Sequence, residues 1–158
     1  IVMRRTNSLL PGAHRLNVPW PRRLGTPPWG AQRELEYGAA RRGTEYTLDV
    51  LRTDSRSELV RSFDTLVDVV AEGEPGLLYV GNTVAPRHVV LVLPGDGDRM
   101  LDVYDPGSGR VSHLRRDVVV EGRLGLSGWD VPWIAVRPTG VRSVRRSSYA
   151  VAPGAAPA

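Results

Sequence analysis

The stretch that decides the fold runs from residue 86 to residue 111 and reads PRHVVLVLPGDGDRMLDVYDPGSGRV. Residues 87–94 are almost continuously apolar after the histidine, which is typical of a central strand buried on both faces. The sequence PGDGD indicates a hairpin turn, and residues 99–106 form the returning strand, which ends in the turn DPGSG. We therefore predict an antiparallel pair of strands at the centre of the protein.

Two polar side chains stand at the outer ends of this predicted hairpin. His88 opens the first strand and Asp105 ends the second, and the pairing register places them roughly opposite each other. A carboxylate that accepts a hydrogen bond from one imidazole nitrogen fixes the tautomer and leaves the other nitrogen free as a base. His88 and Asp105 are therefore candidates for a catalytic pair. A structural alternative stays open, because aspartate before Pro-Gly commonly forms a turn and histidine at a strand start is often a satisfied polar end.

Helices precede this hairpin in the sequence. Residues 28–42 predict a helix for which Thr26 can be the N-cap, and residues 57–72 predict a second helix with Ser57 as its N-cap. The apolar stripe of the second helix comprises Leu59, Phe63, Leu66, Val67 and Val70.

The remaining predicted strands are short. They cover residues 45–51, 76–81, 109–114 and 132–138, whereas residues 115–128 fit either a strand or a short helix. The pattern predicts an α+β fold with N-terminal helices and a C-terminal antiparallel sheet.

Charge divides the chain into three parts. We predict a basic, proline-rich irregular segment at 1–27, a single α+β domain at 28–138 and a disordered basic, Ala/Pro-rich tail at 139–158. The basic ends either bind nucleic acid or another anionic surface, or lie back on the acidic middle of the chain. Because the sequence opens at Ile1, we also expect a piece of a longer protein or a processed product.

The composition excludes several kinds of site and segment. The chain has no cysteine and three histidines that lie far apart, so it has no disulfide and no cysteine nucleophile, and we expect no metal site and no cofactor. No apolar run approaches the roughly 20 residues that span a bilayer. Without a secretory signal or a cysteine, the sequence favours a cytoplasmic protein.

The segment 86–111 resembles the His–Asp half of papain-like cysteine peptidases, especially those of the C39-like type. In these enzymes a strand opens with histidine, a hairpin follows, and an aspartate or asparagine lies in a turn that begins with Asp-Pro. The segment GWDVPWIAVRP at 128–138 is similar to their closing strand, and the predicted helix at 57–72 is similar to a helix that precedes a strand under their active site. The wider pattern also resembles actinobacterial proteins in which a Cys-Gly-x-Thr segment lies N-terminal to the matching part.

This resemblance implies a papain-like fold that acts on an amide or thioester carbonyl, with His88 as the base and Asp105 as the residue that orients it. The family nucleophile is a cysteine at the start of a buried helix, and this chain has none. Gln32 can be compared with the glutamine of the family's oxyanion hole, although no cysteine follows it. We therefore expect a domain that is catalytically incomplete as it stands.

Other functions stay open at this level. The same fold without a nucleophile would serve as a peptide- or protein-binding module, or as a subunit of a larger assembly. A small nucleic-acid-associated protein that uses its arginine-rich ends is a third interpretation. Thr26 and Ser127 are the nearest replacements for the missing nucleophile, but neither lies in a nucleophile-elbow sequence such as G-x-S-x-G.

Overall fold

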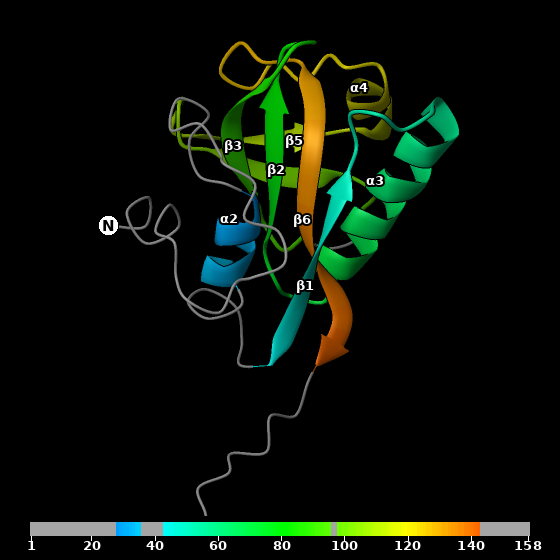
Figure 1. Ribbon diagram of the computed structural model, residues 1–158, viewed down its shortest axis with the longest axis vertical. Coiled ribbons are helices and arrows are strands. Elements are labelled where there is room, and N and C mark those ends of the chain that lie inside the picture. Colours follow the sequence, from blue (N-terminus) through cyan, green and yellow to red (C-terminus); the bar gives the residue numbers. More distant parts are fainter. Residues whose placement is uncertain (1–27, 36–42, 96–97, 143–158) are drawn as a thin grey trace, which may run out of the picture.

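The computed structural model describes residues 28–35, 43–95 and 98–142. In these residues three helices accompany a six-stranded antiparallel sheet, which confirms the α+β class (Figure 1). The helices are α2 (Pro28–Glu34), α3 (Arg56–Ala71) and α4 (Arg116–Val120). None of these described helices is long and apolar enough to cross a membrane. The predicted N-terminal segment 1–27, which includes Thr26, and residues 36–42 of the predicted first helix lie outside the described residues.

The sheet joins strands from both halves of the chain. Its members are β1 (Thr44–Val50), β2 (Gly76–Gly81), β3 (Pro86–Val92), β4 (Leu101–Asp105), β5 (Arg110–Leu114) and β6 (Val131–Arg142). They are arranged in the order β1-β6-β2-β3-β4-β5, and neighbouring strands run antiparallel.

The last strand is longer than the sequence predicts. β6 continues to Arg142, which pairs with Thr44 of β1. The predicted tail at 139–158 therefore begins too early, because residues 139–142 are held in the sheet by this pairing. Residues 143–158 lie outside the described part of the chain.

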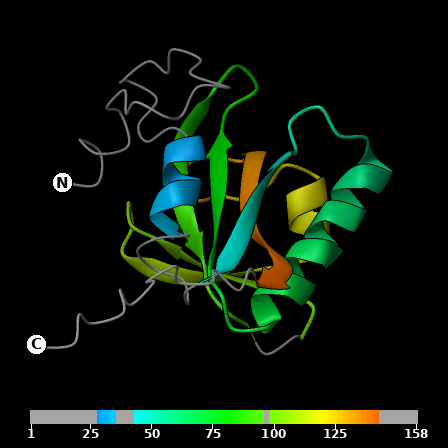
Figure 2. The same cartoon turned by 60° about the horizontal axis from the view of Figure 1, so that its bottom comes forward.

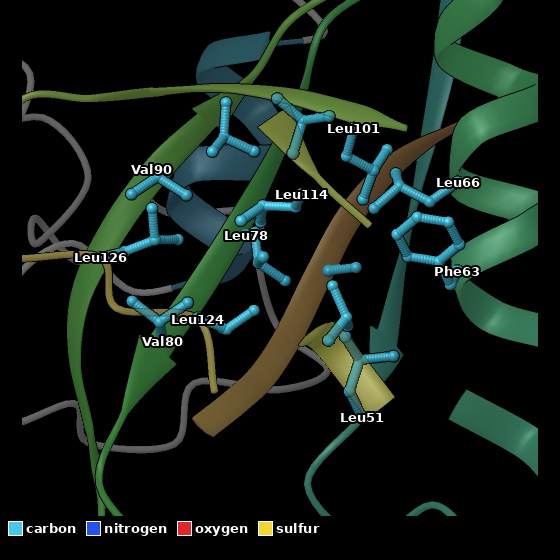
Figure 3. Packing of buried hydrophobic residues seen from close by; sticks show 14 of the residues in the cluster. Leu51, Phe63, Leu66, Leu78, Val80, Val90, Leu101, Leu114, Leu124 and Leu126 are labelled. Atoms are coloured by element: carbon cyan, nitrogen blue, oxygen red, sulfur yellow. The ribbon is translucent and has the colours of Figure 1, made fainter. Parts of the chain in front are cut away.

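Helices cover both faces of the sheet. α2 packs on one face and α3 and α4 on the other (Figure 2). The smaller cluster, on the α2 side, comprises Ala31, Leu35, Tyr46, Tyr79 and Val136. The larger cluster lies on the α3 side, where Val80 and Val90 of the sheet meet Leu124 and Leu126 of the segment that leads to β6 (Figure 3).

β3 lies inside the sheet, as predicted, but it is not buried on both faces. Val90 and Val92, on the α3 side, are fully buried, whereas Val89 and Leu91 are only half-buried. The reason is that α2 packs mainly on β1 and β6 and leaves the other face of β3 incompletely covered. The prediction from the apolar sequence that this strand is buried on both faces is therefore wrong.

α3 confirms the predicted apolar stripe but begins at a different cap. Phe63, Leu66, Val67 and Val70 are buried, and Leu59 is partly buried against the same cluster. The N-cap is Ser55, not Ser57: Ser55 Oγ accepts a hydrogen bond from the Glu58 amide, and Glu58 Oε2 accepts one from the Ser55 amide. This capping box needs a spacing of three residues before the glutamate, which Ser57 does not have.

Candidate active site

The strands β3 and β4 position the predicted pair. Leu91 lies opposite Tyr104, and the same register carried to the end of β4 sets Asp105 opposite Val90, two residues from His88. Side chains two residues apart on a strand share a face, so His88 and Asp105 are diagonal neighbours on the α3 side of the sheet. The sequence predicted the correct ends of the two strands, although the pair is diagonal and not directly opposite.

The two side chains meet. His88 Nε2 lies 2.6 Å from Asp105 Oδ1, which is a hydrogen-bond distance. The exposed fraction is 17% for the imidazole and 2% for the carboxylate. The pair therefore combines a buried acid with a partly accessible ring.

The turn after β4 also uses Asp105. The Gly107 amide donates to Asp105 Oδ1 at 2.8 Å, and the Gly109 amide donates to the Asp105 carbonyl oxygen at 2.7 Å. The aspartate is therefore both a turn former and the partner of His88. The two interpretations of this residue that the sequence left open are compatible, because one carboxylate oxygen accepts both bonds.

A third donor comes from a distant part of the chain. Ser127 Oγ donates to Asp105 Oδ2 at 2.8 Å, across 22 positions of sequence. The sequence suggests Ser127 only as a replacement nucleophile and does not predict its contact with Asp105. Its neighbours offered a local signal, since Ser-Gly between Leu126 and Trp129 is typical of a two-residue turn, but nothing local says that this turn folds over the end of β4.

The three donors determine the charge of the acid. Burial raises the pKa of Asp105, but hydrogen bonds from His88, Ser127 and the Gly107 amide outweigh it and lower the pKa to about 2. An ionised carboxylate only accepts hydrogen bonds, so His88 Nε2 must carry the proton in the contact between them. In the neutral ring Nδ1 then holds the free lone pair, and this nitrogen is the one able to act as a base.

Gly107 is required by the close packing around the acid. A Cβ atom at this position would collide with Ser127 Oγ and would lie 3.2 Å from both Asp105 Oδ1 and His88 Cε1. Glycine therefore lets the turn backbone pass these side chains without displacing the Ser127 hydroxyl from Asp105. The sequence identified this glycine as part of a turn but gave no sign of the crowding.

The loop before β3 is braced by its own side chains. Asn82 Oδ1 accepts hydrogen bonds from the amides of Val84 and Ala85, both at 2.9 Å, and Trp133 Nε1 donates to the Asn82 carbonyl oxygen at 2.8 Å. The guanidinium of Arg52 lies over the Trp133 ring, 5.5 Å from its centroid. These contacts fix the path of the chain into the strand that presents His88.

Gln32 does not belong to this site. It is part of α2, on the opposite face of the sheet, and its Nε2 donates to the Tyr46 carbonyl oxygen at 2.6 Å. The comparison of Gln32 with an oxyanion-hole glutamine is therefore wrong, because a side chain on the α2 face cannot serve an imidazole on the α3 face.

A second His–Asp pair lies on the surface, outside the candidate site. His113 Nδ1 is 2.5 Å from Asp102 Oδ1, and the side chains are 64% and 34% exposed. Among the residues that the structure describes, no three histidine, aspartate or glutamate side chains gather as a metal site.

Ser127 is badly placed to be a nucleophile. Its hydroxyl donates to Asp105 and not to the imidazole, and a carboxylate whose pKa is about 2 is a weak base for a serine hydroxyl. The arrangement is therefore a histidine held by an aspartate that is held in turn by a serine.

The geometry thus pairs an imidazole with a buried carboxylate, and the described residues include no cysteine thiol beside them. Comparison of the sequence with models of known protein families finds no match, and comparison with curated proteins finds none either.

Proposed function

We propose that this chain is a papain-like, peptidase-related domain that carries the acid–base half of a thiol-dependent acyl-transfer site. His88 is the base and Asp105 is the residue that orients it. The single observation that carries the proposal is the 2.6 Å contact between His88 Nε2 and a buried carboxylate oxygen at a strand end. The order of a helix, an underlying strand, a histidine strand and an aspartate strand supports the papain-like assignment.

The chemistry follows from the free ring nitrogen. Nδ1 of His88 takes the proton of a thiol, and the thiolate attacks the carbonyl carbon of an amide or thioester. A carbon–sulfur bond forms, the bond to the leaving amine or thiol breaks, and the imidazolium returns its proton to that leaving group. Asp105 stays ionised throughout and stabilises the imidazolium.

The thiol has to come from outside these 158 residues, because the chain contains no cysteine. This same fact favours a second function, a non-catalytic module that binds a peptide or protein partner with the surface around His88. The two functions differ in one property, the ability of the His88 imidazole to activate a thiol for attack on an acyl group.

An activated ester tests this property directly. The chain is mixed with p-nitrophenyl acetate and 2-mercaptoethanol, and the release of p-nitrophenolate is followed at neutral pH. The rate without 2-mercaptoethanol is subtracted, so that only the thiol-dependent reaction is compared. We expect the wild-type chain to accelerate this reaction and the substitution His88→Ala to lower the thiol-dependent rate about tenfold. The matched control is His113→Ala, which removes the exposed histidine of the second pair and should leave the thiol-dependent rate unchanged.

Equal rates for the wild-type chain and His88→Ala would contradict the acid–base proposal. The binding-module interpretation would then be preferred, because a folded pair with no reactivity toward an acyl group has only a structural or recognition role.

A further inference from the structure

Ser127 occupies a strained position beside the candidate site. Its φ is +48°, a left-handed conformation that few residues other than glycine adopt. The next residue, Gly128, has φ +82°, and Leu126 and Trp129 exchange two backbone hydrogen bonds across the pair. Two consecutive positive φ values in a two-residue loop define a type I′ turn.

This turn is anchored to the core and to its own segment. Leu126 is 2% exposed and belongs to the large hydrophobic cluster. The Leu124 amide donates to the Asp130 carbonyl oxygen, and the Gly125 amide donates to Asp130 Oδ1. The anchors on both sides of the turn therefore fix the direction in which Ser127 projects.

Asparagine, aspartate and glycine are the residues that suit the first position of a type I′ turn. A serine there costs conformational free energy, and strain of this kind persists where the surrounding structure demands it. The contact that accompanies the strain is the hydrogen bond from Ser127 Oγ to Asp105 Oδ2, 2.8 Å long.

We infer that Ser127 is a positioning residue that orients the Asp105 carboxylate so that Oδ1 faces His88 Nε2. The role of the imidazole itself rests on the proposed function, but the orientation of the acid does not. Both carboxylate oxygens of Asp105 accept hydrogen bonds. Oδ2 accepts one from Ser127, and Oδ1 accepts one from His88 and one from the Gly107 amide. Tilting the plane of the carboxylate about its Cβ–Cγ bond would weaken all three hydrogen bonds, and the serine holds the oxygen that His88 and Gly107 do not contact.

The test removes the hydroxyl without disturbing the turn. Ser127→Gly suits a positive φ better than serine does, so the turn is kept while the donor is lost. Carbon-13 NMR of the side-chain carboxyl group follows the titration of Asp105. We expect Ser127→Gly to raise the pKa of Asp105 by about 1 pH unit, because one of the hydrogen bonds that favour the charged form is gone.

Two further variants separate positioning from folding. Ser108→Gly removes an exposed serine from the neighbouring turn and should leave the Asp105 titration unchanged. Ser127→Asn tolerates the positive φ and carries an amide donor, so it should recover part of the shift. If acid unfolds the protein before the Asp105 titration is complete, the NMR signal of the His88 Nε2–H proton at neutral pH is measured in its place. Ser127→Gly should weaken this signal, because the proton exchanges faster with water, and Ser108→Gly should not.

An Asp105 titration and a His88 signal that are the same in Ser127→Gly and the wild-type chain would overturn the inference. Failure of the proposed function gives a different result. In that case His88→Ala would leave the rate of ester cleavage unchanged, while Ser127→Gly would still shift the titration of Asp105.

Discussion

Two His–Asp pairs in the described part of the chain have almost the same distance, and they differ in nearly everything else. His88 and Asp105 are 2.6 Å apart, and His113 and Asp102 are 2.5 Å apart. The first acid is 2% exposed and accepts hydrogen bonds from three residues, whereas the second is 34% exposed. Asp105 and Asp102 also lie on opposite faces of β4, since they are three residues apart on one strand.

This comparison shows that proximity alone does not make a site. A pair exposed to water is screened, and holding its two side chains together costs entropy, so exposed pairs contribute little to stability. A buried carboxylate with bonded oxygens has a fixed charge and a fixed direction. The two pairs therefore differ in the burial of the acid and in the number of hydrogen bonds that it accepts.

The largest effect should come from deleting the buried acid. Asp105→Ala removes a buried carboxylate together with its hydrogen bonds from His88, Ser127 and the Gly107 amide. Hydrogen bonds to an ionised group are stronger than those between neutral groups. We expect the free energy of unfolding in urea to fall by about 3 kcal/mol. Asp102→Ala is the matched control, and its loss should stay below about 1 kcal/mol. Equal losses would mean that the two pairs are energetically alike.

A methyl group at Gly107 should have the next largest effect. Gly107→Ala pushes a Cβ against Ser127 Oγ and crowds Asp105 and His88, so we expect a loss of about 2 kcal/mol together with altered NMR signals of the His88 ring. Gly109→Ala lies in the same turn, where a Cβ meets no atom within 4 Å but φ is +68°. Gly109→Ala should lower the free energy of unfolding by about 1 kcal/mol through backbone strain and leave the His88 signals unchanged. The same change of the His88 signals in both variants would contradict specific crowding at Gly107.

Acid should reveal the low pKa of Asp105. The folded-state pKa of about 2 lies below the ordinary value of 3.8, so the ionised group stabilises the fold above its unfolded-state pKa. This stabilisation is lost as the pH falls through the folded-state pKa. Between about pH 4 and pH 2 the free energy of unfolding should therefore fall more steeply in the wild-type chain than in Asp105→Asn. Parallel curves would show that Asp105 is not held in its charged form.

The smallest effect concerns the reactivity of the two rings. Diethyl pyrocarbonate acylates accessible imidazoles, and the side chain of His113 is 64% exposed against 17% for His88. Peptide mapping by mass spectrometry should find His113 modified severalfold faster. Faster modification of His88 would mean that its ring is more open than the structure indicates.

Local patterns explain how much could be predicted. The apolar run before PGDGD predicted β3 and β4, and the 3.6-residue stripe predicted α3 with Phe63 in the core. The meeting of His88 and Asp105 followed from strand pairing alone. These features depend on side-chain periodicity and turn residues, which a single sequence displays directly.

The remaining features depend on tertiary packing. Ser127 reaches Asp105 only because Leu126 anchors a distant turn in the core, and the crowding at Gly107 exists only once that turn is in place. The incomplete cover on the outer face of β3 likewise depends on where α2 packs. None of these contacts leaves a periodic signal in the sequence, so the second layer of the candidate site could not be predicted from it.

The proposed chemistry requires that Asp105 fixes the tautomer of His88 and leaves Nδ1 free. Nitrogen-15 NMR of the neutral imidazole rings observes this tautomer, with His113 as the comparison within the same sample. We expect a single His88 tautomer that carries its proton on Nε2 and has an unprotonated Nδ1. A His88 ring protonated on Nδ1, or a mixture of both tautomers as in a ring exposed to water, would contradict it.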